Sequence, residues 1–234
     1  KVVARLIGEA QAAGVVLREG VQFKQLRDDG AGIVSNDGER LHADFVVMAA
    51  GAWTPTLLPH LGDVLWATGQ PVLHFRPRDP SLFQPPRFAV WAADIANSGW
   101  YGFPALADGT FKIANHGPGR RVHPDEPRVI GPDDEAKFRA FLRETFPAMA
   151  DAPVIGSRLC LYCDSWDGNL WIDHDADCPG LIVAAGDSGH AFKFAPVLGG
   201  LIADVLERKP NAYTARFAWR ARGELAAEDA RYTQ

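Results

Sequence analysis

Residues 181–206 read LIVAAGDSGHAFKFAPVLGGLIADVL, and the rest of the chain is arranged around them. A short apolar run, Leu181–Val183, meets a glycine-bracketed turn, Gly186–Gly189, and apolar residues then recur at helical spacing from Val197 to Leu206. The pattern predicts a strand, a tight turn and a helix. Such a junction points free backbone N–H groups and the positive end of the helix dipole at the turn, which favours an electron-rich ligand.

Composition places the chain among ordinary globular proteins and excludes several classes of function. It has 234 residues, 47% of them apolar, and a formal net charge of −5 without a cluster of Lys and Arg, so we expect no nucleic-acid partner. No apolar run approaches the ~20 residues that cross a bilayer, and residues 1–10 lack the features of a signal peptide, so we expect no membrane association. The three cysteines fit a reducing compartment, and we expect a cytoplasmic protein. The chain begins at Lys1, inside a predicted helix, so we expect a piece of something longer.

The first 65 residues predict part of an α/β layer. Apolar side chains recur at helical spacing over Val2–Ala13, and Gly14 is placed to stop that helix in a left-handed conformation. We expect a short buried strand at Val15–Leu17 and then a hairpin whose turn lies at 28–32. The continuous apolar run Ala43–Gly51 predicts a strand that is covered on both faces of a parallel sheet.

The middle of the chain has a different pattern. From Trp66 to Asn115, short alternating runs rich in aromatic residues predict an antiparallel sheet. A helix is expected from Pro132 until Pro147 ends it, and Val154–Tyr162 is expected to form a further strand. The predicted fold class is therefore α/β with an α+β insert. The antiparallel insert spans 66–153, and the α/β layer is formed by 1–65 and 154–234.

Three basic side chains could carry chemistry. Lys193 lies among aromatic residues near the start of the predicted helix, where its ammonium either extends to solvent or binds a carboxylate. On a strand over Thr110–His116, Lys112 and His116 share one face while Phe111 and Ile113 take the other. The face with Lys112 is either a solvated edge or part of a site, and the residues alone leave both alternatives open.

The cysteines have a C-x-x-C spacing that invites a redox or metal interpretation. On a strand, however, Cys160 and Cys163 point to opposite faces, so they are expected to share neither a disulfide nor a metal. Cys160 shares a face with Arg158 and Tyr162, and it is either a small buried apolar residue or a nucleophile whose thiolate Arg158 favours. The acids around His174 are typical of a solvated turn, and no metal is expected.

Five ordered motifs resemble those of one enzyme family. They are ADFVVMAAGAWT (43–54), YGFP (101–104), KIANH (112–116), LCLY (159–162) and, above all, AAGDSGHAFKF (184–194). In that order and with comparable spacing, they resemble the later two-thirds of monomeric sarcosine oxidase and N-methyltryptophan oxidase. These are FAD-dependent amine oxidases of the glycine oxidase and D-amino acid oxidase superfamily. The resemblance implies that 1–65 and 154–234 belong to an FAD-binding domain and that 66–153 is a substrate-binding domain.

The resemblance also implies roles for individual residues. Cys160 matches the cysteine that binds the flavin 8α carbon covalently, and Lys112 matches a lysine near flavin N5 that stabilises developing superoxide. Lys193 matches the lysine that binds the substrate carboxylate. Tyr101, His116 and Tyr162 match positions in the substrate pocket and are expected to contribute to catalysis. The implied contacts to the flavin are made by Cys160, Gly51, Ala52, Trp53, Gly186, Ser188, Gly189, His190 and Lys193.

The activity that the resemblance implies is oxidation of a secondary amine. A hydride leaves the C–H bond beside the nitrogen, the resulting imine hydrolyses, and oxygen reoxidises the flavin to give hydrogen peroxide. The expected partners are a small amine or N-methyl amino acid and molecular oxygen. Two rivals are a flavin-dependent dehydrogenase with another electron acceptor and a non-catalytic interaction module without flavin. The family's N-terminal G-x-G-x-x-G unit has no counterpart here, so the FAD pyrophosphate is expected to bind a missing N-terminal segment of the same protein.

Overall fold

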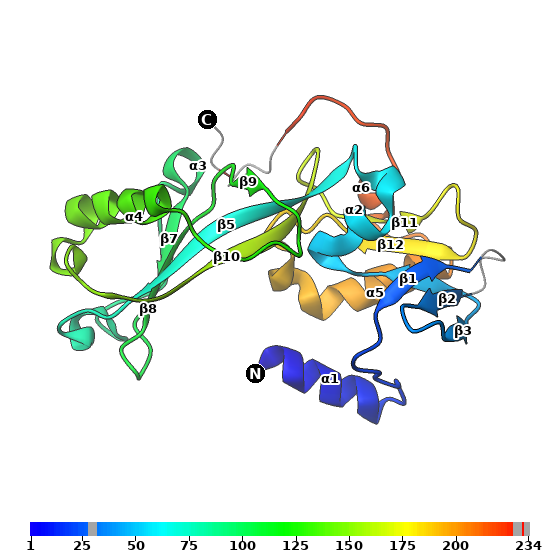
Figure 1. The fold of residues 1–234 in the computed structure, drawn as a ribbon, viewed down its shortest axis with the longest axis horizontal. Coiled ribbons are helices and arrows are strands. Elements are labelled where there is room, and N and C mark those ends of the chain that lie inside the picture. Colours follow the sequence, from blue (N-terminus) through cyan, green and yellow to red (C-terminus); the bar gives the residue numbers. More distant parts are fainter. Residues whose placement is uncertain (28–31, 227–230, 232–234) are drawn as a thin grey trace.

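The computed structural model describes residues 1–27, 32–226 and 231 of the chain. A larger antiparallel sheet occupies one end of the molecule and two smaller sheets occupy the other (Figure 1). The helices are α1 (Val2–Ala12), α2 (Thr54–Leu57), α3 (Ile95–Ser98), α4 (Pro132–Thr145), α5 (Ala195–Leu206) and α6 (Thr214–Phe217). No helix of the described ranges combines the length and the apolar composition that a membrane crossing requires.

The larger sheet confirms the predicted antiparallel sheet, but it also contains β10, which was expected in the α/β layer. Its strands are β5 (Leu65–Phe75), β6 (Trp91–Ala93), β7 (Trp100–Phe103), β8 (Phe111–Asn115) and β10 (Val154–Ser165), with the short β9 (Arg120–Arg121) at one edge. The spatial order is β10-β5-β8-β7-β6, β9 pairs with β5, and every neighbouring pair is antiparallel. The aromatic and β-branched residues of these runs suit a half-buried pleated surface, which explains why they form strands.

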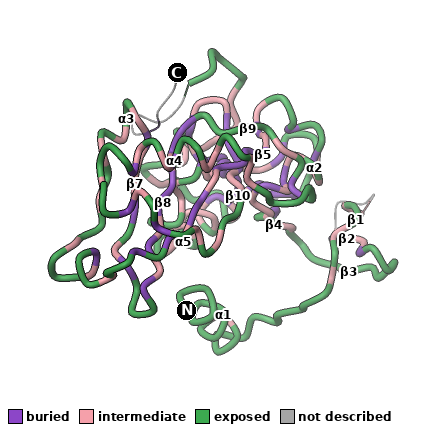
Figure 2. The backbone as a smooth tube through the Cα atoms, turned by 60° about the vertical axis from the view of Figure 1, so that its left-hand side comes forward, coloured by how far each residue is buried: buried purple, intermediate pink, exposed green. Residues whose placement is uncertain are grey.

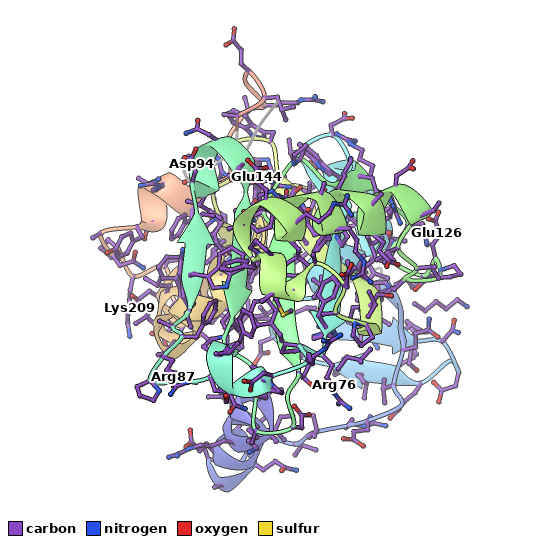
Figure 3. All side chains as sticks on the ribbon, turned by 90° about the vertical axis from the view of Figure 1, so that its left-hand side faces the viewer. Arg76, Arg87, Asp94, Glu126, Glu144 and Lys209 are labelled. Atoms are coloured by element: carbon purple, nitrogen blue, oxygen red, sulfur yellow. The ribbon has the colours of Figure 1, made fainter. Side chains whose placement is uncertain are left out.

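One face of the larger sheet packs against α4 and forms the first core. Phe111 and Ile113 are fully buried there, as the alternation along β8 predicts, and Phe138 and Leu142 of α4 meet them. The helix begins where expected, because the Asp134 carboxylate accepts the Gly131 N–H at 2.8 Å and acids in the first turn complement the helix dipole. Viewed from this side, α4 lies across the sheet (Figure 3), and Glu144 near its C-terminal end is exposed.

The stretch at 181–206 folds as predicted. Leu181–Ala185 forms β12, which pairs in parallel with β4 (Val46–Met48) and antiparallel with β11 (Trp171–His174). Leu181 and Val183 point to the second core, and Ile182 points to a third core under α5. After the turn come the 3-10 helix η5 (Ala191–Phe194) and α5. β12 is the central strand of its sheet, and both of its faces are buried.

The remaining sheet is a meander near the N-terminus. It contains β1 (Phe23–Leu26), β2 (Gly32–Ser35) and β3 (Arg40–His42), in that order and antiparallel. The pairing of β1 with β2 confirms the predicted hairpin. Residues 28–31 of its predicted turn lie outside the described residues.

Two predicted elements near the N-terminus differ from the structure. Val15–Leu17 is not a strand: Val16 is 81% exposed, because in the described part of the chain no strand lies beside it to accept its backbone hydrogen bonds. The strand predicted at Ala43–Gly51 is shortened to β4, and Val47 is 39% exposed rather than covered, because β4 is an edge strand. Helix α1 ends before Gly14, as predicted, and its exposed surface is visible in Figure 2.

Strands β5 and β10 connect the two ends of the molecule. They pair from Phe75 opposite Val154 to Leu65 opposite Ser165. Phe75 lies in the first core, whereas Leu65 and Cys163 lie in the second. The predicted domain boundaries fall at the beginnings of these two strands, and the division into domains stays a prediction.

Packing around Gly102 on β7 generates a first test. A Cβ atom added at Gly102 would lie 2.5 Å from Trp91 Cζ2 and 2.8 Å from the Lys112 carbonyl oxygen. We expect Gly102→Ala to lower the free energy of unfolding by about 1–3 kcal/mol, because the backbone of β8 cannot move away cheaply. Urea unfolding followed by circular dichroism measures this loss.

The control for Gly102→Ala is a glycine in open space. A Cβ at Gly8, in the middle of α1, would meet nothing within 4 Å. Gly8→Ala should therefore leave stability unchanged or raise it by up to about 1 kcal/mol through helix propensity. Equal stability of the two variants would contradict the close packing of β6, β7 and β8.

Candidate active site

Strand β10 presents two different faces. Cys163 is fully buried in the second core, and burial raises the pKa of its thiol to about 12. Cys160 is half-buried on the opposite face and interacts electrostatically with Tyr101, Tyr162 and Lys112. Both thiols are free, which confirms that the C-x-x-C spacing makes no disulfide. Cys160 is therefore the thiol of this strand that can reach a ligand.

Lys112 on β8 reaches the same face. Its Nζ lies 5.0 Å from the centroid of the Phe103 ring and 5.9 Å from that of Tyr101. Burial lowers the pKa of the Lys112 ammonium, and the nearby Arg158 guanidinium lowers it further, while Cys160 acts in the other direction. Among the described residues, no carboxylate pairs with Lys112. A half-buried cation on aromatic rings suits a ligand that carries or develops negative charge.

Tyr162 and His116 meet beside Lys112. The Tyr162 hydroxyl lies 3.4 Å from His116 Nδ1, and the two rings are tilted at 59° to each other. Tyr162 also hydrogen-bonds Tyr101 of β7, and burial raises the pKa of both phenols. The two tyrosines are therefore neutral at ordinary pH and act as hydrogen-bonding groups.

The turn after β12 is attached directly to β10. Gly186, Ser188 and Gly189 all have positive φ, at 71°, 44° and 78°. The Ser188 N–H donates to the Cys163 carbonyl at 2.9 Å, and a Cβ on Gly189 would lie 2.3 Å from the Tyr162 ring. Position 189 therefore needs glycine for both its conformation and its close approach.

Asp187 ties the same turn together with its carboxylate. Oδ1 accepts the N–H of Gly189 at 2.7 Å and the N–H of Cys163 at 3.3 Å. Burial raises the pKa of Asp187, and the two N–H groups act against that rise. The side chain thus fixes the turn on the strand that carries Cys160.

The glycine turn after β4 also lies against β10. Gly51–Trp53 forms the 3-10 helix η1, which packs on β10, with Gly51 at φ 54° and Ala52 buried. Trp53 Nε1 donates to the Asp125 carboxylate at 2.7 Å. The structure therefore brings η1, Cys160, Tyr162 and the Gly186–Gly189 turn to one strand.

The last two predicted residues lie further along the turn. His190 Nε2 is 3.0 Å from the Gly168 carbonyl oxygen, which holds the imidazole beside the loop after β10. Lys193 is exposed on η5, and its Nζ lies 5.2 Å from the centroid of the Phe194 ring. Among the described residues, Lys193 has no hydrogen bond, ion pair or ring contact with Tyr162 or Lys112. Its role in binding the substrate carboxylate therefore stays a prediction.

Sequence reasoning missed several residues of this face. His74 of β5 pairs with Lys112 in the strand register, and its pKa is lowered by burial and by Lys112 and Arg158. Alternation along Pro71–Phe75 contains that signal, because Leu73 and Phe75 are buried and His74 faces the other way. Arg231, which pairs with Asp164, had no local signal in the charged C-terminal region.

The residues of this face fit a flavin. A free thiol supplies an attachment point, and Lys112, which has no carboxylate partner among the described residues, supplies a positive charge. Positive charge complements the electron-rich edge of a flavin ring. The residues that could hold it are those of η1, Cys160 and the turn from Gly186 to His190.

Comparison with known proteins gives the face a context. The family model described as DAO: FAD dependent oxidoreductase matches residues 1–205. Monomeric sarcosine oxidase of Bacillus sp. (strain B-0618) is 29% identical over 206 residues, which are 86% of this chain and 52% of that protein. N-methyl-L-tryptophan oxidase of Salmonella arizonae is 30% identical over 211 residues, 86% of this chain and 54% of that protein.

A solved structure agrees with these relatives. Fructosyl amine: oxygen oxidoreductase (Amadoriase I) from Aspergillus fumigatus superposes with a TM-score of 0.82 and 25% identity, over 97% of this chain and 56% of its own. The chain spans about half the length of the curated relatives it matches. The family resemblance and the mixed α/β fold class are thereby confirmed. With its family model matched from Lys1 to Val205, the chain belongs to the DAO family of FAD-dependent oxidoreductases.

Proposed function

We propose that this chain carries the substrate side of the active site of an FAD-dependent amine oxidase. The proposed reaction is oxidation of a secondary amine of the N-methyl amino acid type to an imine, with reduction of oxygen to hydrogen peroxide. The observation that carries the proposal is the convergence of Cys160, Lys112 and Tyr162 on one sheet face beside the Gly186–Gly189 turn. The names of the relatives, oxidases of sarcosine and N-methyl-L-tryptophan, support the substrate class.

Cofactor binding is assigned to residues around β10. When bound, the flavin supplies the two-electron chemistry by accepting a hydride from the carbon beside the amine nitrogen. Cys160 would attach it through a thioether to the 8α carbon. Forming that bond removes the thiol hydrogen and one 8α hydrogen, and the two electrons released reduce one oxygen molecule to hydrogen peroxide. The backbone of η1 and of the turn from Gly186 to His190, both of which lie against β10, would line the flavin site.

Lys112 is assigned the step in which oxygen is reduced. Its ammonium is held on the Tyr101 and Phe103 rings and lacks a carboxylate partner among the described residues. A fixed cation in a partly dry site stabilises negative charge that develops on oxygen, at no cost of reorganisation. Burial lowers the pKa of Lys112, so its ammonium loses a proton more readily than that of a solvated lysine.

Substrate binding is assigned to Tyr101, His116, Tyr162 and Lys193. The neutral phenols of Tyr101 and Tyr162 can donate hydrogen bonds without attracting a second charge. His116 is buried against Tyr162 and is placed to keep that ring in position. The exposed Lys193 ammonium, four residues after Gly189, is the group proposed to bind the substrate carboxylate.

The covalent assignment is tested by acid precipitation of the protein that carries this chain. We expect the precipitated protein to stay yellow, and a Cys160→Ser variant to release all of its flavin into the supernatant, because a hydroxyl cannot replace the thiolate as nucleophile. Absorbance of the supernatant measures the release. Cys178→Ser is the matched control, since Cys178 is a half-buried thiol beside Asp175 and should keep its flavin. Free flavin from the unmutated protein would rule out the thioether.

The role of Lys112 is tested by the reaction of the reduced protein with oxygen. Lys112→Met keeps the side-chain length and removes the charge, and we expect reoxidation to slow by about 100-fold or more. Stopped-flow absorbance of the flavin measures this rate, separately from substrate oxidation. Lys137→Met, on the exposed side of α4, should not change it. Unchanged reoxidation in Lys112→Met would remove the argument that Lys112 provides for oxygen as the electron acceptor.

A further inference from the structure

Arg231 lies against the proposed substrate site from the C-terminal end of the chain. Its guanidinium binds both oxygens of Asp164, with Nη1 at 2.6 Å from Oδ1 and Nη2 at 2.9 Å from Oδ2. The side chains of Arg231 and Asp164 are 7% and 5% exposed. Its Cζ also lies 5.7 Å from the centroid of the Tyr162 ring. We propose that Arg231 is a positioning residue that fixes Tyr162 and the His116–Pro118 segment.

The guanidinium joins three parts of the site. Besides Asp164 of β10, Nε donates to the Gly117 carbonyl at 3.0 Å and Nη2 donates to the Pro118 carbonyl at 3.5 Å. Gly117 follows His116, whose Nδ1 is 3.4 Å from the Tyr162 hydroxyl. The planar fork of arginine can satisfy a carboxylate and neighbouring carbonyls at once, which lysine cannot do.

The same segment is held from its other side by β5. Gln70 Nε2 donates to the Gly117 carbonyl at 2.5 Å. Gly119 has a φ of 63° and leaves no room for a Cβ between Thr68 and Gln70. The His116–Gly119 segment is thus hydrogen-bonded by both Gln70 and Arg231, and of these two side chains Arg231 also contacts the Tyr162 ring.

Arg231 does not act as a substrate-binding cation. Its charge is neutralised by Asp164 in a buried bidentate pair, and its N–H groups are used on Asp164, Gly117 and Pro118. A buried arginine whose charge is paired and which donates four hydrogen bonds within the protein is suited to holding its neighbours in place rather than to binding a ligand. Arg231 lies beyond residue 205, where the match to the family model ends, and its positioning role rests on the contacts of its own side chain.

The segment that precedes Arg231 supplies a matched control. Arg220 makes a second bidentate pair, with Nε and Nη2 each 2.7 Å from an oxygen of Asp167, and its Cζ is 4.5 Å from the Trp171 ring centroid. Residues 218–226 leave α6 and run towards the larger sheet (Figure 1), and the Ala226 N–H donates to the Trp166 carbonyl. Arg220 therefore resembles Arg231 in chemistry but contacts the second core instead of the site.

The test compares Arg231→Lys with Arg220→Lys in the protein that carries this chain, and its kinetic part rests on the proposed function. We expect KM for the N-methyl amino acid to rise about tenfold in Arg231→Lys while kcat stays within about threefold, because displaced binding groups weaken ground-state and transition-state binding alike. Arg220→Lys should change neither constant. Amide hydrogen exchange should accelerate at residues 116, 117 and 119 in Arg231→Lys only.

Kinetics and hydrogen exchange distinguish failure of the Arg231 role from failure of the proposed function. If the unmutated protein oxidises no amine, the function fails, and the exchange at 116–119 still decides whether Arg231 clamps that segment. Equal KM values in Arg231→Lys and the unmutated protein, or equal increases in both variants, would overturn the positioning role. If Arg231→Lys does not fold, Asp164→Asn combined with Arg231→Gln removes both buried charges together, and the same increase in KM is expected.

Discussion

The antiparallel pairing of β5 with β10 is the interaction on which the rest of the structure depends. It runs without a break from Arg158 opposite Val72 to Ser165 opposite Leu65. One end of the pair contributes to the core under α4, and the other contributes to the core beside β12. The candidate site lies on the face of this pair that carries Cys160 and Tyr162, so its residues are positioned by the same hydrogen bonds that hold the two cores together.

Strand alternation on that ladder separates side chains of similar chemistry. Cys160 and Cys163 are three residues apart, and only Cys163 is placed in the core, where its thiol is held protonated by burial. The basic groups His74, Lys112 and Arg158 come from three adjacent strands and share the face with Cys160. Burial lowers the pKa of His74 and Lys112, and neighbouring positive charge lowers it further, so the face favours ligands that bring negative charge.

The sequence was informative wherever structure is decided by neighbours along the chain. The strand, turn and helix at 181–206, the antiparallel sheet and α4 follow from periodicity, capping and glycine placement. Val15–Leu17 could not be judged in this way, because a strand requires a partner that local pattern does not reveal. Within the site, Lys112, Cys160 and Tyr162 follow from alternation and family motifs. Arg231 does not, because its contacts with Gly117 and Asp164 join positions far apart in sequence.

The attachment of the Gly186–Gly189 turn to β10 has a consequence for protein engineering. The backbone carbonyl of Cys163 accepts the Ser188 N–H, and the backbone N–H of Cys163 donates to the Asp187 carboxylate. The turn and the strand are therefore expected to move together. A larger residue in the turn would displace Tyr162 along with it. Phe103 lies on β7, and the backbone of that strand is separated from β10 by β8 and β5. If the proposed substrate site is correct, substitutions at Phe103 should alter substrate preference while the turn is left intact.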